Sequence, residues 1–333
     1  MSDMVAVNVP DMQQRYLGRT GLQVSRLGLG TLTWGRDTDE HEARDQLKAF
    51  VEVGGTLIDT AAGYGDGASE ELIGSLLGDV VSRDEVVLAT KAGVRRARGA
   101  GAGVRAREVD VSRGSLLRSL DRSLQRLGTD HVDLWQVHAW SDDVALEETL
   151  TALDTAVTSG RAAYVGVSNY AGWQAAQAAT WQRAVPGRAP LASDQVEYSL
   201  LNRAVEAEVL PAASALGLGV LAWSPLGRGV LTGKYRTGTP ADSRAASPHF
   251  GDYVGVYLDE RCARIVEAVA RAADGLGWSP LEVALAWVRD RPEVTTALVG
   301  ARTAAQLRAS LTVEECTLPE ELRTALDDVS ARP

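Results

Sequence analysis

The chain has 333 residues, of which 45% are hydrophobic and 23% charged, and its formal net charge at pH 7 is −10. These fractions are those of an ordinary globular protein, and an α/β barrel of this length forms a single domain. The negative charge argues against nucleic acid or an anionic membrane surface as a partner, because both would repel it.

Cysteines and targeting signals narrow the class further. Cys262 and Cys316 are too few for a disulfide framework, and neither has metal-ligand spacing to another Cys or His. The first 16 residues lack the basic segment and long apolar run of a secretory signal. Residues 162–182 carry no charge, but polar side chains interrupt them too often for a membrane span. We therefore expect a cytoplasmic protein with no metal site and no membrane partner.

The predicted elements begin with a β-hairpin. Residues 15–30 hold apolar stretches on either side of a turn at Gly18–Gly21, and such a hairpin could plug the bottom of a barrel. Residues 1–14 are expected to be an N-terminal extension and residues 15–333 one domain. Stretches rich in Val, Ile and Leu then predict eight strands. They are residues 25–32, 56–61, 85–93, 131–140, 162–170, 192–200, 218–226 and 294–301.

Stretches of helical periodicity lie between these strands. The clearest are residues 40–53, 112–128 and 146–160, and the second is expected to start at a Ser112 cap and end at Gly128. Buried strands that alternate with helices indicate a parallel sheet covered by helices. Eight such units predict an α/β fold of the closed (β/α)8 TIM barrel type.

An open, doubly wound sheet is the structural alternative. It would usually carry the dinucleotide motif GxGxxG after its first strand, but residues 28–33, GLGTLT, lack the third glycine. Residues 227–235, GRGVLTGKY, also fail as a P-loop, because the glycine spacing is one residue too long and Tyr235 stands where Ser or Thr is needed. The sequence therefore carries neither phosphate motif.

Two segments do not fit the repeat of strands and helices. They are the Arg/Gly-rich residues 94–108, after the third strand, and residues 227–258, after the seventh. Both follow the C-terminal ends of strands, where barrel active sites are built, so we expect long loops over a site. A flexible insertion without function is the alternative for the arginine-rich segment.

Ionisable residues at the ends of apolar strands require an explanation. Asp59 ends the second strand, Tyr64 follows it, Lys91 ends the third strand and His138 ends the fourth. Each alone has an ordinary structural explanation, such as a turn cap for Asp59 or a hydrogen-bonded core histidine for His138. Their placement together at one mouth favours catalysis, because Lys and Asp are rarely buried near each other without a purpose.

This set of residues suits carbonyl reduction. Hydride addition leaves negative charge on the carbonyl oxygen, so a proton donor is needed. Tyrosine titrates near ~10, and an adjacent Lys⁺ lowers that value by stabilising tyrosinate. Tyr64 is the predicted donor, Lys91 its cationic partner, Asp59 the residue that holds Lys91, and His138 the one that polarises the carbonyl.

The segments DTAAGYG, LATKAG and QVHAW, in this order and spacing, resemble the catalytic tetrad segments of the aldo-keto reductases. The likeness runs from near Arg15 to residues 300–310 and points to the branch with bacterial reductases and potassium-channel β-subunits. It implies a barrel that binds NADPH across its mouth without a Rossmann motif, with NADP(H) preferred over NAD(H).

The resemblance also implies a set of cofactor-binding residues. Ser168, Asn169 and Gln195 would hold the nicotinamide carboxamide, and Trp223 would lie beneath the ring. A glycine-rich loop would wrap the pyrophosphate, and Arg302 would pair with the ribose 2′-phosphate. The whole predicted set is Thr31, Leu32, Asp59, Ser168, Asn169, Gln195, Trp223, Ser224, Pro225, Leu226, Gly227, Gly229, Lys234, Gly300, Arg302 and Gln306.

One departure concerns the adenine. Many relatives carry a Glu-Asn pair where this chain has Ala309 and Ser310, so the resemblance does not extend to adenine contacts there. The predicted substrate pocket consists of Trp34, Tyr64, His138 and Trp140, whose aromatic walls favour apolar or sugar-like carbonyl compounds.

The leading interpretation is an NADPH-dependent reductase of aldehydes or ketones, and a keto-sugar reductase shares its mechanism. A nicotinamide-binding regulatory or redox-sensing subunit is the alternative of a different class. The potassium-channel β-subunits that represent it have Asn at the place of His138, so the complete tetrad favours an enzyme. A barrel hydrolase is disfavoured because no second carboxylate pairs with Asp59 at the other strand ends.

Overall fold

Eight parallel strands close into a barrel in this computed structural model, which describes residues 12–97 and 107–331. Each strand pairs with its neighbours in chain order, and the last, β12, pairs with the first, β3. The predicted TIM barrel and all eight predicted strands are confirmed. The strands are β3 (Leu27–Gly30), β4 (Leu57–Asp59), β5 (Val87–Ala92), β8 (Val132–Val137), β9 (Ala162–Ser168), β10 (Leu191–Glu197), β11 (Gly219–Trp223) and β12 (Val294–Val299).

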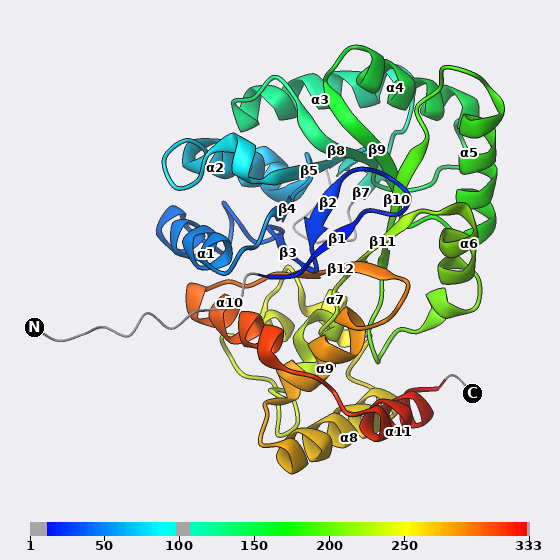
Figure 1. Cartoon of the computed structure of the whole chain (residues 1–333). Coiled ribbons are helices and arrows are strands. Elements are labelled where there is room, and N and C mark those ends of the chain that lie inside the picture. Colours follow the sequence, from blue (N-terminus) through cyan, green and yellow to red (C-terminus); the bar gives the residue numbers. More distant parts are fainter. Residues whose placement is uncertain (1–11, 98–106, 332–333) are drawn as a thin grey trace, which may run out of the picture.

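Helices surround the barrel and cover the outer faces of its strands (Figure 1). They are α1 (Glu40–Glu52), α2 (Ala68–Leu76), α3 (Arg113–Leu127), α4 (Leu146–Thr158), α5 (Gly172–Ala184), α6 (Val209–Leu216), α7 (Gly251–Gly255), α8 (Glu260–Leu276), α9 (Pro280–Arg289), α10 (Ala304–Leu311) and α11 (Glu320–Ser330). Short 3-10 turns are η1 (Tyr64–Gly67), η2 (Arg83–Glu85), η3 (Ala204–Glu206), η4 (Gly227–Thr232), η5 (Arg244–Ala246) and η6 (Thr312–Glu315). No helix in the described part of the chain is both long and apolar enough to cross a membrane.

Helix α3 corrects one local prediction. It ends at Gly128, as expected, and this glycine has a left-handed φ of 65°. Ser112 occupies the N-cap position, but its side chain does not cap the helix. Its hydroxyl instead donates to Asp110 Oδ1 at 2.7 Å.

The predicted N-terminal hairpin closes the bottom of the barrel. Strands β1 (Gln14–Tyr16) and β2 (Gln23–Ser25) pair antiparallel, and Figure 1 looks into the barrel from the side that they cover. Leu17 and Val24 are fully buried and pack with barrel-interior residues such as Leu57 and Leu134. At the turn, Gly18 has φ +57°, and a Cβ there would lie 2.3 Å from Gly217 O, so only glycine fits.

The two segments outside the repeat have structure of their own. After β5, strands β6 (Val94–Arg96) and β7 (Arg107–Val109) form an antiparallel pair. The middle of that predicted loop, residues 98–106, lies outside the described residues, as do residues 1–11 of the predicted extension. After β11, turns η4 and η5 and helix α7 build a long strap, which we define as residues 224–258.

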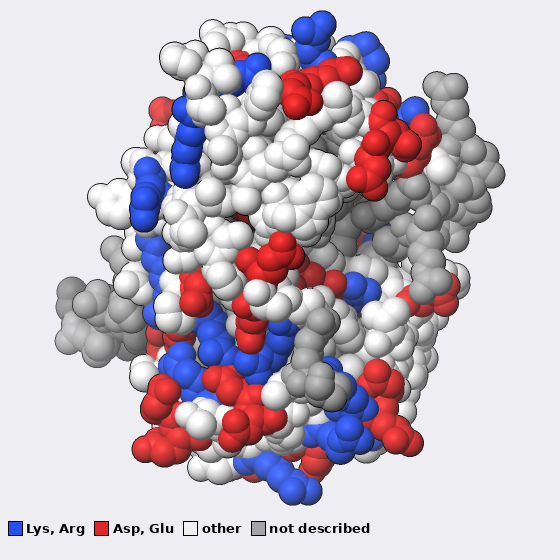
Figure 2. Space-filling model, turned by 90° about the vertical axis from the view of Figure 1, so that its right-hand side faces the viewer, with Lys and Arg blue, Asp and Glu red and all other residues white. Residues whose placement is uncertain are grey.

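The molecular surface mixes its charges. On the face in Figure 2, basic and acidic side chains lie interspersed rather than in separate patches. Exposed ion pairs of the described residues include Arg236 with Glu267 and Arg95 with Glu108. This face therefore presents no broad single-sign field to a polyanion.

Candidate active site

The four predicted catalytic residues meet at the C-terminal mouth of the barrel. Asp59, Tyr64 and His138 line a cavity of about 420 Å³, and Lys91 lies outside that lining, bonded to Asp59. Asp59 is the last residue of β4, Lys91 lies near the end of β5, and His138 directly follows β8. Tyr64 opens η1, the turn after β4. Parallel strands bring these positions together because all their C-terminal ends face the same way.

A buried ion pair forms the floor of the site. Lys91 Nζ lies 2.6 Å from Asp59 Oδ2 and also donates to Thr60 O at 2.8 Å. Lys91 and Asp59 are only 1% and 2% exposed. The Lys91 ammonium lies 5.3 Å from the centre of the Tyr64 ring, which meets the His138 ring edge to face with 6.0 Å between centroids.

The surroundings keep Lys91 charged. Burial alone lowers the pKa of its ammonium, but Asp59 and then Tyr64 outweigh that effect, so the pKa lies above its ordinary value. A charged ammonium beside a phenol stabilises the tyrosinate form relative to a site without that charge. This is the electrostatic condition for a tyrosine that releases its proton readily.

Amide and hydroxyl groups surround the ion pair. Gln195 Nε2 donates to Asp59 Oδ1 at 2.8 Å, and Ser168 Oγ donates to Gln195 O at 2.8 Å. Asn169 Nδ2 donates to His138 O at 2.9 Å, while Asn169 Oδ1 accepts from Trp223 Nε1 at 3.0 Å. The residues predicted to hold a carboxamide are therefore joined to the predicted catalytic residues.

Unusual backbone geometry marks the same mouth. In the described chain, the non-glycine residues with positive φ are Asp66, Asn169, Ser224 and Arg228, with φ between 52° and 59°. Three of them line the cavity, and Asp66 lies in the turn that carries Tyr64. Such conformations cost free energy and tend to gather at functional sites.

Cations gather at one part of the cavity lining. Lys234, Arg244 and Arg302 all line it, and no carboxylate lies within ion-pairing distance of them among the described residues. Burial, together with the charges of Arg244 and Arg302, holds the pKa of Lys234 below its usual value. An anion bound here would relieve this repulsion, which is the property of a phosphate site.

Sequence reasoning missed part of the lining, about half of it in the strap. The missed residues of the strap are Arg228, Thr232, Arg244, Phe250 and Tyr253, and those outside it are Gly30, Leu281, Leu298 and Val299. The position of the strap after the seventh strand was a signal, but its sequence has no period that shows which side chains turn inward. Arg228 is held firmly, since it donates to both carboxylate oxygens of Glu197, at 2.8 and 2.6 Å.

Two predicted pocket residues lie elsewhere. Trp34 is fully buried, donates from Nε1 to Gln46 Oε1 at 3.1 Å and lies outside the cavity lining. Trp140 also lies outside the lining and packs edge to face against Tyr170 and Trp173. Of the predicted cofactor set, Gly227 is buried outside the lining, whereas Ala309 and Ser310 are part of it.

The described residues hold no cluster of three or more His, Cys, Asp or Glu side chains that could bind a metal ion. The cavity instead combines amides and an aromatic ring with cations, a donor set suited to a nicotinamide dinucleotide.

Comparisons with known proteins show the family of the chain. The sequence profile of the Aldo/keto reductase family matches residues 26–331. The chain is 38% identical to the uncharacterized oxidoreductase YrpG of Bacillus subtilis (strain 168), over 97% of both chains. It is 35% identical to a probable voltage-gated potassium channel subunit beta of Oryza sativa subsp. japonica, over 87% of both chains. It is also 35% identical to L-glyceraldehyde 3-phosphate reductase of Escherichia coli (strain K12), over 90% of this chain and 87% of that relative.

Fold, site and relatives together define an oxidoreductase built on a TIM barrel. The chain belongs to the aldo/keto reductase family, as its tetrad segments predicted, and carbonyl reduction is the general activity that this membership supports.

Proposed function

We propose that this protein reduces an aldehyde or ketone to an alcohol with NADPH, and that Tyr64 donates the proton. The observation that carries the proposal is the buried Lys91–Asp59 pair beside Tyr64, with His138 packed edge to face against the tyrosine ring. A buried lysine in this position has little structural use, because an apolar residue would fill the space without the cost of desolvating a charge.

The residues of the cavity suit the cofactor. The amide groups of Asn169 and Gln195 match a carboxamide, and Lys234, Arg244 and Arg302 match phosphates. When bound, the nicotinamide would supply the hydride. Arg302 is our candidate for the 2′-phosphate contact, and hence for a preference for NADP(H) over NAD(H).

The catalytic side chains then polarise the carbonyl, donate the proton and stabilise the tyrosinate. His138 donates a hydrogen bond to the carbonyl oxygen and polarises it, and Tyr64 gives up its proton as charge develops on that oxygen. Lys91 stabilises the tyrosinate that remains, and Asp59 keeps Lys91 charged and in place.

A nicotinamide-binding subunit of a larger assembly is the second candidate, and the similarity to potassium-channel β-subunits favours it. It predicts cofactor binding without rapid turnover. A keto-sugar reductase would differ from the leading proposal only in its substrate.

Replacement of Tyr64 by Phe tests the proposal. Because general acid catalysis contributes ~10²–10⁴-fold, we expect Tyr64→Phe to lower kcat for a panel of aldehydes, ketones and keto sugars by about that factor. NADPH affinity, measured by fluorescence titration, should change by less than about threefold, since the phenol oxygen acts on the substrate. Tyr16→Phe, a change at a tyrosine that is 60% exposed, is the matched control and should leave both values unchanged. Undiminished turnover in Tyr64→Phe would remove Tyr64 as the donor.

A further inference from the structure

Gln195 occupies a place between the expected carboxamide site and the ion pair. It lies in β10, is 2% exposed and lines the cavity. Its Nε2 is 2.8 Å from Asp59 Oδ1, while the other oxygen of the same carboxylate, Oδ2, is 2.6 Å from Lys91 Nζ. A carboxylate only accepts hydrogen bonds, so the amide NH₂ must be the end that faces Asp59.

The backbone holds this side chain in position. The carbonyl of Gln195 accepts from Ser168 Oγ at 2.8 Å and from the backbone N–H of Asn169 at 2.9 Å. Both donors belong to the residues expected to contact the carboxamide. The backbone of Gln195 is therefore fixed by the residues expected to contact the carboxamide, and its side chain bonds Asp59.

Other titratable groups also surround the pair. His138 packs edge to face against Tyr64 from the end of β8, and Tyr253 of α7 lines the same cavity. Two further buried acids, Glu70 and Asp194, have other neighbours. Glu70 of α2 accepts from Thr90 behind β5, and Asp194 lies beside Tyr170 on the opposite face of β10 from Gln195.

We propose that Gln195 is a positioning residue, which holds the Asp59 carboxylate against Lys91 and thereby links the cofactor's carboxamide site to the Tyr64 proton donor. This inference rests on the proposed function for the role of Tyr64. It assigns Gln195 a second task beside cofactor binding, carried out through Asp59 and Lys91 rather than on the substrate.

The electrostatic consequence has a definite sign. The Gln195 N–H draws part of the Asp59 negative charge toward Oδ1. Without it, more of that charge faces the Lys91 ammonium and offsets the stabilisation of tyrosinate. Loss of the donor should therefore raise the pKa of Tyr64.

The test measures the Tyr64 pKa in the free protein, by the ultraviolet absorbance of tyrosinate during a pH titration. Tyr64→Phe in the same background is subtracted, so that only the Tyr64 signal remains. We expect Gln195→Met, which keeps the side-chain length and removes the donor, to raise the Tyr64 pKa by about half a unit or more. Gln195→Glu, a second variant of nearly the same shape, adds a carboxylate beside Asp59 and should raise it further.

Ser168→Ala is the matched control. It removes a predicted cofactor contact, while Asn169 N–H still holds Gln195 O. It should weaken NADPH binding in a fluorescence titration and leave the Tyr64 pKa unchanged, whereas Gln195→Met should alter both.

The outcomes separate the two proposals. An unchanged Tyr64 pKa in both Gln195 variants overturns the positioning role, whatever the protein binds. If the wild-type protein binds no nicotinamide dinucleotide and reduces no carbonyl, the proposed function fails, and the titration of the free protein still decides whether Gln195 acts on Tyr64.

Discussion

Arg302 is the residue on which the cofactor preference depends. It lies two positions before α10 and lines the cavity, as do Lys234 and Arg244. The start of a helix often binds anions through its free N–H groups. Here Ala304 N already donates to Glu42 Oε2 at 2.6 Å, so a carboxylate occupies part of that site. A phosphate would therefore depend on the side chain of Arg302 more than on the helix.

We expect Arg302→Ala to weaken NADPH binding by about 10–100-fold, because a hydrogen bond to a charged group is worth ~1.5–3 kcal/mol. NADH lacks the 2′-phosphate and should lose less than about threefold. Parallel fluorescence titrations with the two dinucleotides measure the difference. Arg308→Ala, an exposed arginine outside the lining of the cavity, makes the same charge change and should affect neither. Equal losses for NADPH and NADH in Arg302→Ala would contradict a 2′-phosphate contact.

At the scale of elements, the strap contributes many of the residues that line the cavity, so we expect it to affect release of a bound dinucleotide. Arg228 fixes it to the barrel: the guanidinium forms two hydrogen bonds with Glu197 of β10 and donates to Tyr253 O at 2.6 Å. It also stacks 3.9 Å from the centre of the Tyr253 ring. Arg236 ties the same strap to Glu267 of α8, but that pair is exposed at 44% and 42%.

We expect Arg228→Met to raise the dissociation rate of NADPH by about tenfold or more, because the strap loses charge-assisted hydrogen bonds. Met is no more strained than Arg at a φ of 58°, so the backbone should tolerate the change. Stopped-flow fluorescence with excess competing NADP⁺ gives the rate. Arg236→Met, the control on the same strap, should stay within about twofold of wild type, as exposed pairs contribute little. Equal rates in the two variants would show that the Glu197 contact does not hold the strap closed.

The elements that sequence could predict are those whose burial is uniform. Most of β8 is apolar and buried, namely Val132, Leu134, Trp135 and Val137, so the strand could be predicted and His138 recognised at its end. The sequence of the strap has no such apolar pattern to show which of its side chains face the cavity. Phe250 is placed by a contact with Arg36, whose guanidinium lies 4.3 Å from the ring centre and belongs to a segment far away in sequence. Trp34 follows a strand end as Trp140 does, and only its contact with Gln46 of α1 shows that it packs away from the cavity.

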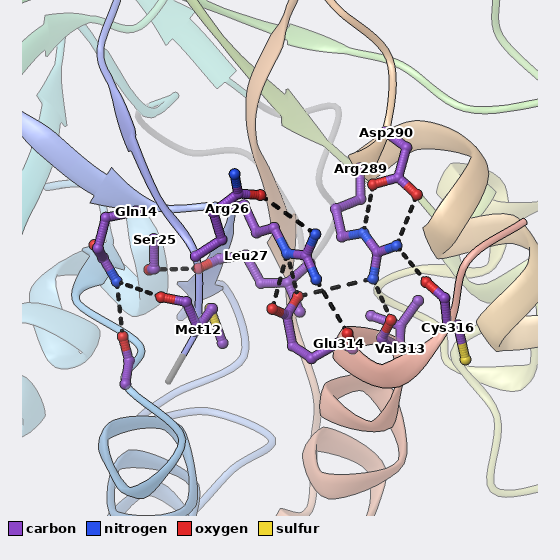
Figure 3. Close-up of polar contacts among 12 residues, drawn as sticks. Met12, Gln14, Ser25, Arg26, Leu27, Arg289, Asp290, Val313, Glu314 and Cys316 are labelled. Atoms are coloured by element: carbon purple, nitrogen blue, oxygen red, sulfur yellow. Dashed lines mark hydrogen bonds and ion pairs between the residues drawn. The ribbon is translucent and has the colours of Figure 1, made fainter. Parts of the chain in front are cut away.

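At the scale of the whole molecule, an arginine network joins the two ends of the barrel sequence (Figure 3). Arg26, next to β2, pairs with Glu314 of η6 at 2.8 Å. Arg289, at the end of α9, donates to Cys316 O at 2.7 Å and to Val313 O, and both its Nε and Nη2 reach Asp290. In the sequence Arg289 looks like an ordinary exposed arginine in the last turn of a helix, yet it is 1% exposed. Its role depends on chain segments that meet only in the folded barrel.

Because these contacts exist only in the folded state, their loss should lower the free energy of unfolding of the whole barrel. Arg289→Met fills similar space but leaves Cys316 O and the Asp290 carboxylate without the Arg289 donor, while Val313 O keeps the backbone N–H of Cys316 at 3.0 Å, and we expect a loss of about 3–5 kcal/mol. Urea unfolding followed by tryptophan fluorescence measures it. Arg271→Met makes the same substitution in an exposed pair with Glu267 and should cost less than about 1 kcal/mol. If Arg289→Met unfolded at the same urea concentration as Arg271→Met, the network would be a consequence of the fold and not one of the interactions that stabilise it. A large loss of unfolding free energy with unchanged NADPH affinity in the remaining folded protein would instead show that Arg289 stabilises the barrel without contributing to the cofactor site at its mouth.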